Sequence, residues 1–128
     1  MKLLVLAATA LAFAAPAKPV ELAIVHALHG CHVWHTTKDV GPATTVKLKR
    51  GGKITIRVSC PMDFHLAQLK GPPLALGDPT LQTGTQRTLV FPRRGVYVVQ
   101  ATETTTSAEL GLQTLGPDNV LRLTVTVT

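Results

Sequence analysis

Four of the five histidines of this 128-residue chain lie within ten residues, in the stretch HALHGCHVWH. They are His26, His29, His32 and His35, and Cys31 and the single tryptophan lie among them. Imidazole and thiolate ligands together suit copper or zinc. The stretch therefore predicts metal chemistry, provided that some of these side chains converge.

The spacing alone does not bring the four imidazoles together. In an extended strand successive side chains point to opposite faces, so the four histidines would divide between the two faces. An α-helix would spread them over about half its circumference. Gly30 is a suitable place for a β-bulge, which would redirect Cys31 and His32. A metal site here would therefore need donors from other parts of the chain, and Met62 offers a soft thioether.

The first seventeen residues have the pattern of a secretory signal. Lys2 supplies a positive region, residues 3–15 form an apolar run, and Ala15-Pro16-Ala17 has the small residues of a cleavage site. The apolar run is too short to span a bilayer, and no later stretch is long enough. We expect residues 1–17 to be a signal peptide and residues 18–128 to be a single domain, exported to the periplasm or secreted, with no membrane span.

Export gives Cys31 and Cys60 an alternative to metal binding, because two thiols in an oxidising compartment tend to pair. A Cys31–Cys60 disulfide would close a loop of about 30 residues and stabilise the fold by about 3 to 4 kcal/mol in the chain-entropy model. It would also remove the thiolate from any metal site. The two cysteines alone leave both outcomes open.

The net charge of +6 does not indicate nucleic-acid binding. The basic residues are scattered, with adjacent pairs only at Lys49-Arg50 and Arg93-Arg94. Three phenylalanines, one tyrosine and one tryptophan cannot supply a stacking surface for bases. We interpret the charge as favouring solubility and a mild attraction for anionic partners.

The elements that must position these residues have the pattern of strands. Alternating or β-branched apolar residues predict strands at these positions: 20–34, 44–49, 53–58, 87–91, 96–101 and 120–127. The Gly-containing turns at 50–52 and 92–95 predict that the strands on either side of each turn pair as hairpins.

Two longer segments connect these strands. Residues 70–86 are rich in proline and glycine and predict a loop that crosses between layers, while residues 107–115 allow at most a turn of helix. Short alternating strands separated by frequent turns favour an all-β sandwich.

From residue 44 onward the order of features resembles the cupredoxin superfamily. The strand KITIRV is followed by a short loop with a histidine, SCPMDFHLAQL, then by the segment RTLVFPRRGVYVV and a final alternating strand. The resemblance implies a cupredoxin-like Greek-key β-sandwich of about seven to eight strands with any metal at one end. It also implies that His65 is the upstream imidazole ligand.

The chain departs from this resemblance in the loop before the last strand. Cupredoxins with type 1 copper carry a Cys, a His and usually a Met there, whereas TETTTSAELGLQTLGPDN contains none of the three. The trigonal thiolate–imidazole site cannot form from this loop. If the first strand ends beside the metal end, the expected ligands are Cys31, His32 and His65, with His35 and Met62 as less certain members.

These observations predict a binding protein and not an enzyme. Ser59 and Ser107 lie in no nucleophile motif, and a Cys–His nucleophile would need a reduced thiol outside the cell. We expect an exported protein that binds copper, with zinc or no metal as alternatives. Its task would be metal handling in preference to electron transfer, with a copper-donor or redox protein as partner. The alternative is a metal-free, disulfide-stabilised binding or envelope module.

Overall fold

The computed structural model describes residues 18–26, 32–37, 39–104 and 120–128. Within these residues the chain forms ten strands and no helix. The strands are β1 (Val20–His26), β2 (His32–His35), β3 (Asp39–Gly41), β4 (Ala43–Leu48), β5 (Gly52–Val58), β6 (Phe64–Lys70), β7 (Thr80–Leu81), β8 (Gln86–Phe91), β9 (Gly95–Glu103) and β10 (Val120–Val127). In the part of the chain that the structure describes, nothing forms a helix long and apolar enough to cross a membrane.

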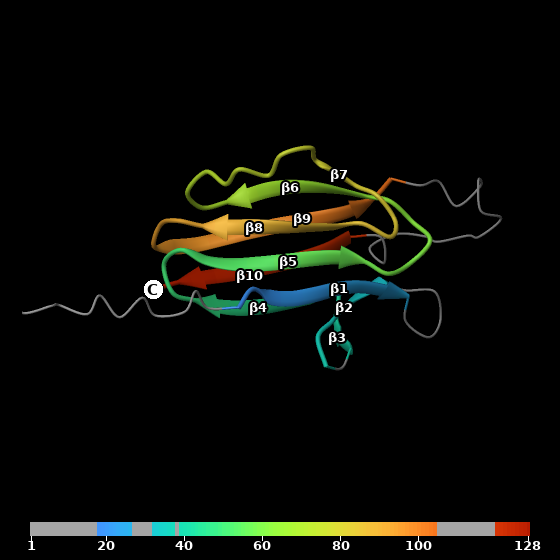
Figure 1. Ribbon diagram of the computed structural model, residues 1–128, viewed down its shortest axis with the longest axis horizontal. Helices are drawn as coiled ribbons and strands as arrows, with labels where there is room; N and C mark the ends of the chain where they lie inside the picture. The colour runs from blue at the N-terminus through green and yellow to red at the C-terminus, as the bar shows by residue number, and fades with distance from the viewer. Residues whose placement is uncertain (1–17, 27–31, 38, 105–119) are drawn as a thin grey trace, which may run out of the picture.

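The strands form two mixed sheets that lie face to face (Figure 1). The first sheet has the order β3-β2-β1-β5-β8 and the second has the order β4-β10-β9-β6-β7. The pairs β1–β5 and β4–β10 are parallel, and the other neighbours are antiparallel. The predicted all-β sandwich is therefore confirmed. Eight of the described strands have four residues or more, which agrees with the expected number.

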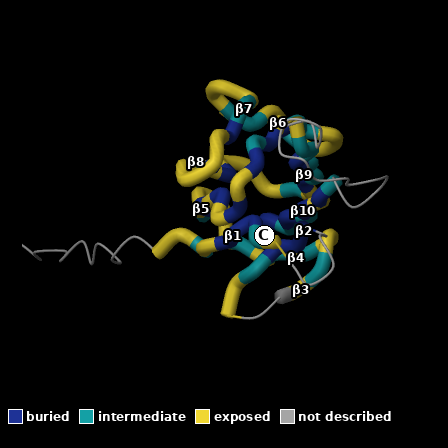
Figure 2. Tube along the Cα trace, turned by 90° about the vertical axis from the view of Figure 1, so that its right-hand side faces the viewer, coloured by how far each residue is buried: buried dark blue, intermediate teal, exposed yellow. Residues whose placement is uncertain are grey.

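The core lies between the sheets and follows the alternation of the sequence. In Figure 2, buried segments lie inward and exposed turns lie at the periphery. In β10 the side chains at alternate positions are buried: Leu121, Leu123, Val125 and Val127. This confirms the half-buried strand predicted over residues 120–127. Trp34 of the first sheet is fully buried, and its Nε1–H donates to the carbonyl of Arg122 in the second sheet at 3.0 Å.

The two predicted hairpins are wrong. The strands β4 and β5 flank the turn at 50–52 but belong to different sheets, and so do β8 and β9 on either side of 92–95. Gly51, with φ of 84°, permits a tight turn. Alternation of apolar residues shows that a strand is half-buried but does not identify its neighbour. Each of these short turns crosses from one sheet to the other, a separation of about 10 Å.

The expected first strand is also two strands. Residues 20–26 form β1 and residues 32–35 form β2, which pair antiparallel, and residues 27–31 lie outside the described part of the chain. The crossing predicted over residues 70–86 is confirmed, since this segment leads from β6 in the second sheet to β8 in the first and contributes β7 on the way. The helical turn predicted over 107–115 lies outside the described residues.

Candidate metal centre

Two imidazoles meet where β1 ends and β2 begins. His26 and His32 are direct cross-strand partners in the antiparallel pair. The Nδ1 atom of His26 lies 3.2 Å from the Nε2 atom of His32. Their ring centroids are 4.8 Å apart and the rings are nearly perpendicular, at 79°.

The inward face of the first sheet explains why this pair forms. Leu22 and Ile24 of β1 are buried, and alternation puts His26 on the same face, at the open end of the sandwich. In β2 the same alternation puts His32 and Trp34 inward. His32 has no exposed surface and its ring lies edge-on to Phe64 of the opposite sheet, with centroids 5.3 Å apart. The pair thus has one buried and one exposed imidazole.

The spacing of the two nitrogens suits two kinds of chemistry. At 3.2 Å the pair fits a hydrogen bond in which one imidazole donates and the other accepts. It also fits two ligands of a single tetrahedral metal, because metal–nitrogen bonds of about 2.0–2.1 Å place such nitrogens about 3.3 Å apart. Neutral imidazoles bind both copper and zinc.

Two sulfur side chains are buried near the same end of the sandwich, in the connection from β5 to β6. Cys60 is a free thiol with 5 % of its surface exposed, and Met62 is fully buried. Burial raises the pKa of the Cys60 thiol, and the carboxylates of Glu103 and Asp63 raise this pKa further, against a backbone hydrogen bond from Met62. Cys60 is therefore a neutral thiol at neutral pH and not a preformed thiolate ligand.

Hydrogen bonds hold this connection in place. The Thr83 N–H donates to the Asp63 carboxylate at 2.8 Å, and the Thr83 hydroxyl donates to the carbonyl of Cys60. The Thr104 N–H donates to the Asp63 carbonyl at 3.0 Å. Because Phe64 follows directly, these bonds also fix the ring against which His32 packs. We call the group His26, His32, Cys60, Met62 and Phe64 the histidine end.

His65, a predicted ligand, does not lie with this group. Its neighbours Phe64 and Leu66 are buried, whereas His65 is exposed, so it lies on the outer face of the second sheet. There it is flanked in the sheet by Thr80 and Thr102. The described residues therefore do not bring His65 and His32 together. Cys31, the third predicted ligand, lies outside the described residues. Cys60 is unbridged in the structure, so the predicted Cys31–Cys60 disulfide is not shown.

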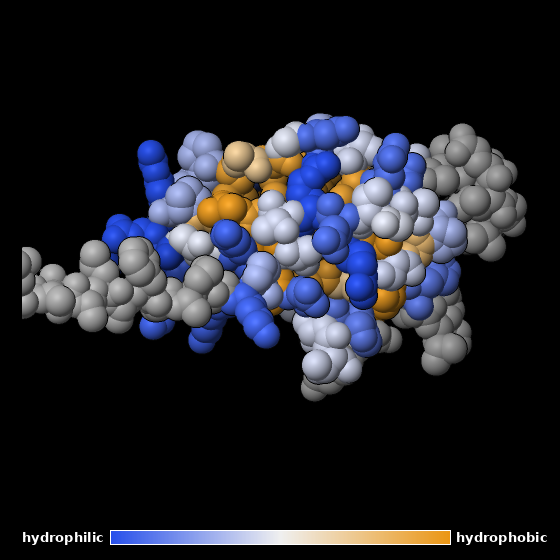
Figure 3. All heavy atoms as spheres, viewed as in Figure 1, coloured by the Kyte–Doolittle hydropathy of each residue, from blue (hydrophilic) through white to orange (hydrophobic). Residues whose placement is uncertain are grey.

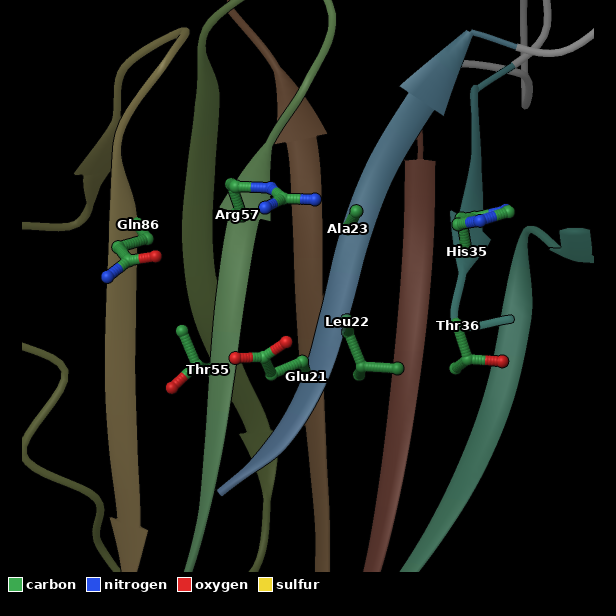
Figure 4. Close-up of a pocket in the computed structure, with 8 residues that line it drawn as sticks. All are labelled: Glu21, Leu22, Ala23, His35, Thr36, Thr55, Arg57 and Gln86. Atoms are coloured by element: carbon green, nitrogen blue, oxygen red, sulfur yellow. The ribbon is translucent and has the colours of Figure 1, made fainter. Parts of the chain in front are cut away.

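His35, a less certain predicted ligand, lies in a different pocket. Trp34 points inward, so the next residue, His35, lies on the outer face of the first sheet. It borders a cavity of about 80 Å³, shown in Figure 4, that Glu21 and Arg57 also line. The pocket exists because Ala23 is small and lies between His35 and Arg57 in the sheet. The Arg57 guanidinium disfavours a metal cation at this position.

The described residues include no cluster of three or more His, Cys, Asp or Glu side chains that would hold a metal ion. They bring together two candidate ligands, His26 and His32, and only His32 was among the predicted ones. His26 was not among the ligands expected from the sequence, which predicts one strand over residues 20–34. The two histidines are equally far from His29, and a hairpin centred there would have paired them.

Comparison with known proteins identifies the fold. No protein-family model matches the chain, and no curated protein matches it in sequence. A reduced-state amicyanin variant matches with a TM-score of 0.50 and 15% identity, over 87% of this chain and 83% of that one. A purple cupredoxin from Nitrosopumilus maritimus matches with a TM-score of 0.49 and 18% identity, over 85% of this chain and 99% of that one. The chain has a cupredoxin-like fold, as its sequence predicts.

Proposed function

We propose that this protein is an exported copper-binding protein that stores or passes the metal, and that His26 and His32 are its ligands. The observation that carries the proposal is the 3.2 Å separation of Nδ1 of His26 from Nε2 of His32 at the open end of the sandwich. The fold supports it, because the resemblance to cupredoxins implies that any metal lies at one end. The protein acts by binding and not as an enzyme.

The two imidazoles have different tasks in this proposal. His32 is fully buried and its ring is oriented by Phe64, so it supplies a fixed nitrogen. His26 is exposed, so a donor or acceptor protein can approach its side of the metal. Copper, when bound, would supply a one-electron redox centre at this position. The neutral Cys60 thiol and the Met62 thioether are buried near the same end of the sandwich, and such soft groups favour copper over harder metals.

Metal handling is favoured over electron transfer by the ligands that the chain offers. The loop before β10 has no Cys, His or Met from residue 102 to residue 119, so the trigonal site with a weak axial ligand has no source for its usual ligands. A site with an exposed imidazole exchanges its metal more readily than a closed one. Cys31 remains the predicted third ligand, and export through residues 1–17 would place the protein where a copper donor protein operates.

Copper content and competition measurements test the proposal. Purified protein spanning residues 18–128 is loaded with copper, dialysed, and titrated against a chromogenic chelator. We expect close to one copper per chain in the wild type, and loss of retention in His26→Ala and His32→Asn. His35→Ala and His65→Ala are the matched controls and should retain the metal. Circular dichroism of each variant shows that the sandwich is intact.

Two outcomes would overturn this assignment, and a third would change its metal. Wild-type protein that retains no copper supports the metal-free module instead, and a thiol titre of zero would then identify the Cys31–Cys60 disulfide as its stabilising element. Copper loss in His65→Ala with retention in His26→Ala would restore the ligand set predicted from sequence. Tight retention of zinc in preference to copper would change the metal but keep the site.

A further inference from the structure

The end of the sandwich opposite the histidine pair carries most of the positive charge. Eleven of the lysines and arginines lie in the described residues, and eight of them are at this end, all exposed. We call the eight the basic end: Lys18, Lys47, Lys49, Arg50, Lys53, Lys70, Arg93 and Arg94. In sequence they are scattered, and only the fold gathers them.

Backbone contacts show how separate turns come together here. The Arg50 N–H donates to the Thr128 carbonyl at 3.1 Å, and the Gly51 N–H donates to the Phe91 carbonyl at 2.8 Å. Gly71, which follows Lys70, packs against the start of β9, where an added Cβ would lie only 2.6 Å from the Val96 carbonyl oxygen. Figure 1 shows the same convergence, since β5 and β9 begin where β8 and β10 finish.

Exposed apolar side chains accompany the cations. Four large hydrophobic side chains are exposed among the described residues, and three of them, Leu69, Val90 and Val96, lie at or beside this end. Val90 is the cross-strand partner of Lys53, and Leu69 directly precedes Lys70. Figure 3 shows hydrophilic and hydrophobic residues side by side on this part of the surface.

A groove in the same surface has an apolar floor and a charged rim. Its volume is about 350 Å³, and five of the eight cations line it together with Val20 and Leu48. The described acidic side chains lie away from it. Glu21 is the acidic residue nearest to the groove in the first sheet, where its neighbour on β5 is Thr55. Asp63 and Glu103 lie near Cys60, at the opposite end of the sandwich. The basic end thus combines several cations with little compensating charge.

We propose that the basic end binds the surface of a membrane that contains anionic lipid. Cations within a few ångströms of anionic headgroups attract them, and exposed apolar side chains enter the headgroup region. Docked in this way, the protein turns its histidine end away from the lipid. This proposal does not depend on metal binding.

Vesicle co-sedimentation tests the proposal with protein spanning residues 18–128. Vesicles of phosphatidylcholine alone are compared with vesicles that also contain phosphatidylglycerol. We expect binding to the anionic vesicles only, weakened by added salt because the cations are exposed. The variants Lys49→Glu/Arg50→Glu and Arg93→Glu/Arg94→Glu should each bind about tenfold more weakly or worse.

The matched control is Arg57→Glu/Arg122→Glu, which changes the net charge equally at exposed positions outside the basic end. It should bind as well as the wild type, within about twofold. Equal loss in the control and in the basic-end variants would show that net charge alone acts, and would overturn the proposal. Failure of the wild type to prefer anionic vesicles would also overturn it. Binding to polyglutamate but not to vesicles would assign the surface to an acidic protein instead.

Discussion

At the histidine end a single buried imidazole is held against Phe64, whereas at the basic end eight cations are all exposed to solvent. The first arrangement depends on the core, because His32 lies on the inward face of β2 in the same row as Trp34. The second depends on the turns, which gather charges from five stretches of the sequence.

This difference separates two kinds of recognition. A metal site needs particular atoms at particular separations, so the loss of one ligand removes most of the affinity. Attraction to a charged surface adds up over many residues, so the loss of one cation removes only a share. A single substitution at the histidine end should therefore remove most of the metal affinity, whereas substitutions at the basic end should each weaken lipid binding by a part, and these parts should add.

The largest effect on stability is expected for His32→Ala. His32 has no exposed surface and packs against Phe64, so truncation leaves a cavity and lowers the free energy of unfolding by about 3 kcal/mol. His26→Ala removes an exposed side chain and its 3.2 Å hydrogen bond to His32, and should lower this free energy by only about 1 kcal/mol. Urea denaturation of metal-free protein measures both. Similar losses in the two variants would contradict the buried–exposed division of the pair.

Trp34→Phe should have the next largest effect. The indole N–H donates across the sandwich to the Arg122 carbonyl at 3.0 Å, and phenylalanine removes this part-buried hydrogen bond. We expect a loss of about 1 to 3 kcal/mol in the free energy of unfolding. Vesicle binding should be unchanged, because no cation moves. A parallel loss of vesicle binding would show that the basic end also depends on the core.

The pH dependence of stability tests the state of Cys60. Its pKa in the folded protein is raised above the ordinary value of 9.0 by burial, so the folded state holds the proton more tightly than the unfolded state does. The stabilisation is present below the unfolded pKa and is lost as the pH rises from there through the folded pKa. The slope is at most about 1.4 kcal/mol per pH unit. Cys60→Ala should abolish the slope, and its persistence in that variant would assign it to another group.

The smallest effect is expected for Lys49→Gln. This exposed cation contributes a share of the attraction to lipid, so its neutralisation should weaken vesicle binding by about fivefold or less. The free energy of unfolding should stay within about 0.5 kcal/mol of the wild type. Complete loss of vesicle binding in this single variant would show that one contact dominates at the basic end. This result would contradict the additive behaviour that we expect.

The sequence predicted the sandwich because period-two alternation reports burial on one face, and residues 120–127 show this most clearly. It did not predict strand neighbours. The turns at Gly51 and Gly95 have the residues of hairpins, but they connect strands of different sheets. Alternation and turn composition contain no information on which sheet the next strand joins.

The candidate site was predicted in part. Of the two imidazoles that the structure brings together, the sequence analysis singled out His32 but not His26, because the sequence pattern does not show that β1 and β2 are antiparallel neighbours. His65 was chosen by its place in a resembling loop. Side chains alternate between the two faces of β6. Because Phe64 and Leu66 face inward, the side chain of His65 faces outward. Charge clustering at the basic end had no sequence signal, since the cations come from distant turns.

The places of the first and last long strands have a consequence for how the chain folds. β1 lies between β2 and β5 in one sheet, and β10 lies between β4 and β9 in the other. All strands of the first sheet precede residue 92, but the second sheet is not continuous until β10, the last strand, has been synthesised. The pairing of β10 with β4 joins residues about 80 positions apart. We expect folding to be slow and the sandwich to close only after the whole chain is available. Such delay would suit the export proposed above, because an exported chain crosses the membrane before it acquires its structure.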